Sequence, residues 1–230
     1  MSLGFGPVVS RGSFESSVLG FEERGTGTAV SFQIGTKWEL ERNVSLGLVY
    51  RAPTKIPLKG TGTLVGVGAG SFTAKQHYPA VVNVGVAWQP NGPALRFALD
   101  VEHQYWSQVK SFDRNYTNPV LDSIAKTQLD SKNSLVFRGG AVWNFASSVE
   151  LRAGCSYSEA ALGAGQIIPA QPDFDISSCS LGYGHKAGSI ELNAGIERQW
   201  MRTRTKSNLP FPGTYRMHVN SLLLGAAYSF

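Results

Sequence analysis

Residues 95–102 read LRFALDVE, an alternation of apolar side chains with polar or small ones. Leu95, Phe97, Leu99 and Val101 would share one face of an extended strand, with the residues between them on the other. The same period returns over about 30–40, 44–51, 82–88, 135–144, 149–157, 174–186, 190–197 and 222–230. These stretches predict an all-β chain, and the glycines that recur inside them argue against a helical bundle.

The connections between the expected strands alternate between short turns and long loops. The short turns are ERN at 41–43, PNGP at 90–93, ASS at 146–148 and AGS at 187–189. The long connections cover roughly 58–76, 110–131, 160–173 and 205–214. A transmembrane barrel sorts short periplasmic turns from long external loops, and a soluble sandwich has no reason to do so.

The prediction is therefore an antiparallel transmembrane β-barrel, with about nine or ten strands in this chain. Residues 26–230 would form the barrel portion, and residues 1–25 would hold an incomplete strand and an external loop. The aliphatic face of each strand would meet lipid, and the polar, glycine-rich face would line the lumen.

Two sets of side chains follow from this arrangement. The lumen-facing candidates, which we expect to pair as a ladder of opposite charges, are Arg96, Asp100, Glu102, Arg138, Arg152, Glu191 and Glu197. The aromatic girdles at the two membrane interfaces would contain Trp38, Trp88, Trp106, Trp143, Trp200, Tyr228 and Phe230.

Composition and motifs argue against other classes of function. The chain has 230 residues, 16% of them charged, and its 21 Lys and Arg are too scattered to form a nucleic-acid patch. No G-x-S-x-G, H-E-x-x-H or P-loop motif occurs, and the four histidines lie far apart without metal-ligand spacing. An acid/base pair among the lumen carboxylates is the enzymatic alternative, and a charge ladder is the simpler interpretation. We therefore expect no enzyme, no cofactor and no metal.

Two local features carry further expectations. Cys155 and Cys179 lie on consecutive strands, where they would form a cross-strand disulfide or, as the favoured interpretation, remain two lipid-facing thiols. In the loop 110–131, Asn118 could cap a short helix that begins at Pro119. That helix would cover the barrel mouth or receive an apolar ligand, or it would only pack against neighbouring loops.

The chain ends on an alternating strand whose last residue is Phe230. This ending resembles the terminal strand by which the barrel assembly machinery recognises outer-membrane proteins. That machinery is therefore an expected partner.

Four segments, in order, resemble the FadL/TodX family of outer-membrane transporters. They are Tyr50-Arg51-Ala52-Pro53 with Lys55 and Leu58-Lys59-Gly60, Tyr78-Pro79-Ala80, Asp100-Val101-Glu102 with Trp106-Ser107, and Gly213-Thr214-Tyr215. The resemblance implies passive uptake of long-chain fatty acids or other hydrophobic small molecules across the outer membrane of a Gram-negative bacterium. Its implied partners are such a fatty acid-like molecule, outer-membrane lipid and lipopolysaccharide. The alternatives are a structural or adhesive barrel without conduction and a nonspecific porin.

The family forms fourteen-stranded barrels with an N-terminal hatch, about twice the length of this sequence. The chain could thus be part of such a barrel, with its first strand pairing to sequence upstream, and this interpretation is favoured. The alternative is a reduced barrel in which residues 1–12 pair with the strand at 215–230.

Overall fold

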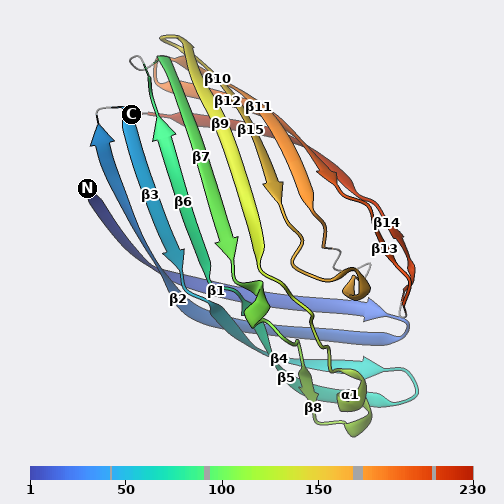
Figure 1. Cartoon of the computed structure of the whole chain (residues 1–230). Helices are drawn as coiled ribbons and strands as arrows, with labels where there is room; N and C mark the ends of the chain where they lie inside the picture. Colours follow the sequence, from blue (N-terminus) through green and yellow to red (C-terminus); the bar gives the residue numbers. More distant parts are fainter. Residues whose placement is uncertain (42, 91–93, 168–172, 209–210, 230) are drawn as a thin grey trace.

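The computed structural model describes residues 1–41, 43–90, 94–167, 173–208 and 211–229. Its main feature is an antiparallel sheet of 13 strands, which confirms the predicted all-β fold. The long strands of the wall are β1 (Ser2–Val18), β2 (Phe21–Glu41), β3 (Val44–Arg51), β6 (Val81–Trp88), β7 (Leu95–Gln104), β9 (Ser134–Ala146), β10 (Val149–Ser158), β11 (Ile176–Ala187), β12 (Ile190–Met201) and β15 (His218–Tyr228). Each pairs with its sequence neighbour in the wall, so the wall is a meander (Figure 1).

The remaining elements lie at the long-loop end of the wall. They are β4 (Thr54–Leu64), β5 (Gly68–Tyr78), η2 (Trp106–Gln108), β8 (Arg114–Tyr116), α1 (Pro119–Ile124), η3 (Ala164–Gln166), β13 (Arg204–Lys206) and β14 (Gly213–Tyr215). The hairpin end of β1 and β2 bends away from the wall and lies beside β4, β5, β8 and α1 (Figure 1). We call this group, residues 11–28 with β4, β5, β8 and α1, the external layer. Among the described residues, no helix has the length and hydropathy to cross a bilayer.

Two parts of the chain are more regular than the sequence suggested. Residues 1–25 form β1, a turn at Leu19–Gly20 and the start of β2, and β1 pairs with β2 along its full length. The expected long connection 58–76 is mostly a β-hairpin, because β4 and β5 pair from Thr54 to Tyr78. Within the described residues, β1 pairs only with β2 and β15 only with β12, so 1–12 and 215–230 do not pair.

Apart from register shifts near the short turns, at Glu39–Glu41 in β2 and Val149–Glu150 in β10, a continuous register divides the side chains of the wall between a concave and a convex face. The convex face exposes large apolar residues such as Val30, 71% exposed, and Leu224, 77% exposed. Contiguous apolar surface of this kind is unfavourable in water and matches the hydrocarbon layer of a membrane.

The buried core of the molecule lies in the external layer. Its members are Ile56, Leu58, Phe72, Ala74, Tyr116, Leu121 and Ala125. Close packing there requires glycine at two positions of β4. A Cβ on Gly60 would lie 2.1 Å from the Arg24 carbonyl oxygen, and one on Gly62 would lie 2.3 Å from the Tyr116 hydroxyl.

The predicted helix in the loop 110–131 is confirmed. The Asn118 side-chain oxygen accepts hydrogen bonds from the backbone amides of Val120, at 3.0 Å, and Leu121, at 3.4 Å, and Pro119 occupies the first turn. Leu121 is fully buried in the core, whereas Val120 and Ile124 are exposed. The helix therefore packs against the neighbouring hairpins through Leu121.

Asn118→Ala should destabilise this helix by about 1 kcal/mol, because the first-turn amides lose their acceptor. Hydrogen exchange at the Val120 and Leu121 amides of the refolded protein should accelerate accordingly. Asn118→Asp, which keeps an acceptor oxygen, is the control and should exchange at the original rate. Equal protection in Asn118→Ala and Asn118→Asp would contradict the capping role.

The expectation of free thiols at Cys155 and Cys179 was wrong. The two residues are bonded, with Cα atoms 4.1 Å apart. The physical reason is register: β10 and β11 pair without a shift, which places Cys155 directly opposite Cys179 on the same face.

Candidate functional site

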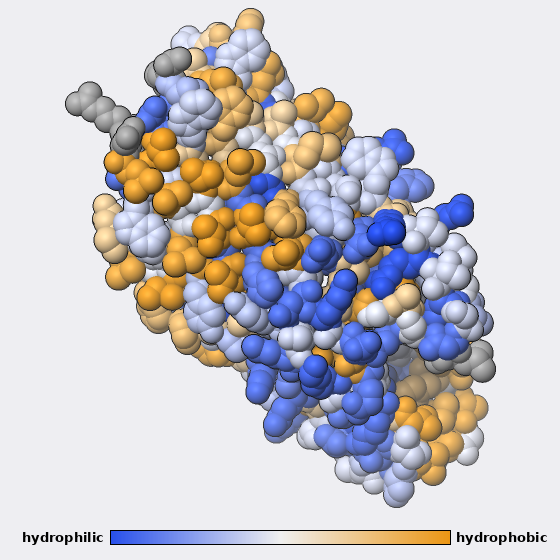
Figure 2. Space-filling view, in the orientation of Figure 1, coloured by the Kyte–Doolittle hydropathy of each residue, from blue (hydrophilic) through white to orange (hydrophobic). Residues whose placement is uncertain are grey.

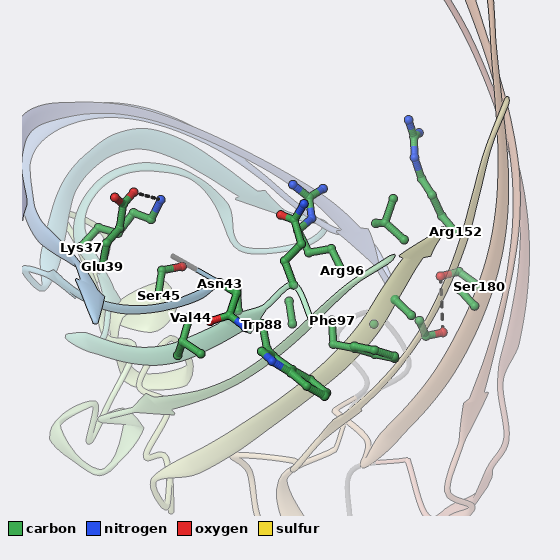
Figure 3. A pocket seen from close by; sticks show the side chains of 18 residues that line it. Lys37, Glu39, Asn43, Val44, Ser45, Trp88, Arg96, Phe97, Arg152 and Ser180 are labelled. Atoms are coloured by element: carbon green, nitrogen blue, oxygen red, sulfur yellow. Dashed lines mark hydrogen bonds and ion pairs between the residues drawn. The ribbon is translucent and has the colours of Figure 1, made fainter. Parts of the chain in front are cut away.

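The concave face of the wall is the candidate functional surface. Figure 3 shows Lys37, Ser45, Arg96 and Arg152 projecting to this side, while Trp88 projects to the other. Register extends the concave face across the wall, and many of its positions hold the smallest side chain: Gly35, Gly47, Gly85, Gly140, Gly154, Gly182, Gly195 and Gly225. Such a surface leaves open space along the inside of the wall.

Three of the predicted lumen residues form one charged cluster. Arg138 on β9 donates from Nη1 to Asp100 Oδ1 at 2.8 Å and from Nη2 to Glu102 Oε2 at 3.0 Å. Asp100 and Arg138 are direct partners in the β7–β9 ladder, so the strands themselves align the ion pair. Asn83 on β6 donates a further bond of 2.9 Å to Asp100 Oδ1.

The cluster continues toward the loop end through neutral groups. The Gln104 side chain donates to Glu102 Oε1 at 2.6 Å and accepts from Trp106 Nε1 at 2.6 Å. Trp106, expected in a membrane girdle, is half-buried and takes part in this polar row. The row spans three strands and fixes the side chains on this part of the concave face.

The other lumen candidates are paired less completely. Arg152 forms an ion pair with Glu150 two residues earlier on β10, and Glu191 accepts a 3.0 Å bond from Asn193. Within the described ranges, neither Arg96 nor Glu197 has an ion-pair or hydrogen-bond partner. The expected continuous ladder of charges is therefore not formed. The charges instead make one cluster around Arg138, one ion pair along β10, and separate charges elsewhere.

A hollow of about 640 Å³ lies at the turn end of the wall. Lys37, Arg96 and Arg152 project into it from β2, β7 and β10, and Ser180 adds a hydroxyl from β11 (Figure 3). Lys37 is paired with Glu39 at 3.2 Å. Arg152 is paired with Glu150. Among the described residues, Arg96 is therefore the cation lining this hollow that has no ion-pair partner and could bind an anionic group.

The predicted girdle residues occupy the strand ends. Trp88, Trp143 and Tyr228 are exposed near the short turns, where Trp38 is half-buried. At the loop end, Trp200 is exposed and the Arg198 guanidinium lies 5.6 Å from the centre of its ring. Phe230 lies outside the described residues.

A second polar cluster, in the external layer, had no signal in the sequence. Glu23 on β2, whose side chain is 4% exposed, accepts a 2.6 Å bond from the Tyr116 hydroxyl. Arg114 Nε lies 3.1 Å from the same carboxylate, as an ion pair whose N–H is not directed at the oxygen. Burial and the hydrogen bond to Glu23 raise the pKa of Tyr116, so its phenol stays protonated and donates. Ninety-three residues separate Tyr116 from Glu23 along the chain.

Across the described residues, no three or more His, Cys, Asp or Glu side chains are grouped so that they could hold a metal ion.

The meander, the apolar convex face and the polar concave face together define the wall of a transmembrane β-barrel. The family model described as "Outer membrane protein transport protein (OMPP1/FadL/TodX)" matches residues 13–230. The chain belongs to this family of outer-membrane proteins, as its sequence motifs indicated.

Solved structures show the same fold. A FadL homologue from Pseudomonas aeruginosa has a TM-score of 0.82 at 17% identity, over 98% of this chain and 64% of that chain. The toluene transporter TodX from Pseudomonas putida has a TM-score of 0.63 at 17% identity, over 91% of this chain and 53% of that one. The chain therefore spans less than two thirds of the length of these relatives. A comparison with curated proteins gives no match.

Proposed function

We propose that this protein forms part of an outer-membrane channel for passive uptake of hydrophobic small molecules, such as long-chain fatty acids. Family membership over residues 13–230 carries the proposal. The glycine-rich concave face supports it, because the glycines leave open space along the wall between its charged side chains. No catalytic step is part of the proposal.

The proposed partners follow from the same setting. They are the transported hydrophobic molecule, the lipid and lipopolysaccharide around the barrel, and the barrel assembly machinery, which would bind the C-terminal strand β15. The convex face of β15 presents Leu222, Leu224 and Tyr228 in alternation, as such a strand requires.

Gly47 offers a direct test of the path. It faces the concave side, opposite Lys37 and Gly85, and a Cβ added there would meet no atom within 4 Å. Gly47→Trp should therefore project an indole ring into the lumen and narrow the path there without disturbing the wall. In a Gram-negative host that lacks its own fatty acid transporter, growth on oleate should fall nearly to the level of cells without the protein.

Leu48→Trp is the matched control, because the next residue of β3 projects from the convex face toward lipid. It should support growth on oleate as the unmodified chain does. Permeability to a small sugar in the same cells separates a nonspecific porin from a hydrophobic channel. Failure of the unmodified, assembled chain to support growth on oleate would favour a barrel without conduction.

A further inference from the structure

The β4–β5 hairpin has two sharply different faces. Ile56, Leu58, Phe72 and Ala74 point into the core of the external layer. The alternate positions Lys55, Lys59 and Lys75 are exposed, and His77 is half-exposed on the same side. We call these four residues the basic face. No Asp or Glu occurs between residues 42 and 99, so the hairpin itself supplies no balancing charge.

The basic face lacks anionic partners from the rest of the molecule as well. In the part of the chain that the structure describes, Lys55, Lys59 and Lys75 form no ion pair or side-chain hydrogen bond. Burial and then the positive charges of Lys55 and Lys75 lower the pKa of His77. The local field is therefore positive, and it favours an anion supplied from outside.

The basic face directly continues the lipid-facing side of the wall. On β2, the exposed convex residue Val30 is followed by Ser31, whose hydroxyl accepts a 2.9 Å bond from Thr54. That bond places Lys55, the next residue of β4, at the edge of the apolar band. Figure 2 shows hydrophobic residues over the upper left of the face drawn and mostly hydrophilic residues below and to the right of them, with a further hydrophobic patch at the lower right. The cations thus lie where a membrane's apolar layer would end.

A hollow of about 350 Å³ adjoins the cations. Its lining includes Pro57, Thr73, Lys75, His77, Lys110 and Asn115. Asp113 also borders it, but its two oxygens already accept bonds from the Ser111 hydroxyl, at 2.8 Å, and the Thr127 amide, at 3.2 Å. The lining suits a phosphorylated sugar better than a fatty acid, because the apolar core lies on the opposite face of the hairpin.

We propose that the basic face binds the phosphate groups of lipopolysaccharide in the outer leaflet. Lysine ammonium groups would contact the phosphates, polar groups of the hollow would receive the sugar, and the acyl chains would lie on the convex band around Val30. The inference rests on the proposed function in the outer membrane. It assigns a binding site to the lipopolysaccharide partner proposed above. A soluble anion would not contact the adjoining apolar band, whereas the acyl chains of lipopolysaccharide would.

The test measures binding of lipid A to the full chain in detergent micelles, by native mass spectrometry. The triple variant Lys55→Gln, Lys59→Gln, Lys75→Gln should bind bisphosphorylated lipid A roughly 100-fold more weakly, given the usual contribution of a lysine near an anionic membrane surface. Dephosphorylated lipid A should bind the unmodified chain as weakly as the triple variant binds the phosphorylated form. The control variant Lys132→Gln, Lys186→Gln, Arg216→Gln removes three exposed positive charges elsewhere and should bind normally.

Equal affinity of the triple variant and the control would overturn the proposal. Competition by millimolar inorganic phosphate would indicate a site for free anions instead. If the triple variant does not assemble, the three single variants at these exposed positions give the same test stepwise. Binding is measured without transport, so its failure is distinct from a failure of growth on oleate.

Discussion

Replacing Arg114 with methionine is expected to destabilise the external layer by about 3–5 kcal/mol, because it leaves a buried carboxylate without a counter-ion. Glu23 is almost fully enclosed, and only the Tyr116 hydroxyl would still bond to it. The methionine also loses the cation–π contact with Phe112, whose ring centre lies 5.5 Å from the guanidinium carbon. A second variant is therefore needed to separate the uncompensated charge of Glu23 from this loss.

Hydrogen exchange along β5 and β8 measures this effect, since it reports local opening while the wall stays folded. The double variant Glu23→Gln with Arg114→Met is the decisive control. Its amide still accepts from Tyr116 but carries no charge, so most of the lost protection should return. If the double variant exchanges as fast as Arg114→Met alone, an uncompensated charge is not the cause.

The wall could be predicted from the sequence because each strand carries its own signal. The two-residue period of LRFALDVE at 95–102 marks which side chains face lipid, and the same residues form β7 with that orientation. The same pattern places Asp100 and Arg138 on the polar faces of their strands, whereas the β7–β9 register makes them direct partners. The facing of each side chain thus needs no knowledge of distant parts of the chain.

The external layer was not predicted, for two different reasons. The hairpin of β4 and β5 has a clear alternation from Lys55 to Lys59, but the glycines at 60–70 made it resemble a loop. Those glycines are needed for close packing, as Gly60 and Gly62 show. The Glu23–Tyr116 bond, in contrast, depends on how the β1–β2 hairpin bends over the loop 110–131. No local pattern encodes that contact.

The sequence left Cys155 and Cys179 either bonded or as free thiols, and the register of β10 with β11 decides for the disulfide. Removing this bond should lower the free energy of unfolding considerably. The bond closes a segment of 24 residues between β10 and β11. By restricting the unfolded chain, a loop of this size is expected to contribute roughly 3 kcal/mol to stability. Cys155→Ala with Cys179→Ala should lower the free energy of unfolding by that amount, with little change in the folded wall, because the strand ladder remains complete.

Urea unfolding of the refolded protein, with and without reductant, separates the bond from other effects of the substitution. Reductant should shift the unmodified chain to the midpoint of the double alanine variant and leave that variant unchanged. Alanine is the suitable replacement because both positions face the convex, lipid side, where a serine hydroxyl would add a separate cost. Alkylation of both thiols in unreduced, oxidatively refolded protein would contradict the bond itself. A formed bond with an unshifted midpoint would mean that the denatured chain already holds β10 and β11 together, so that closing this loop restricts it no further.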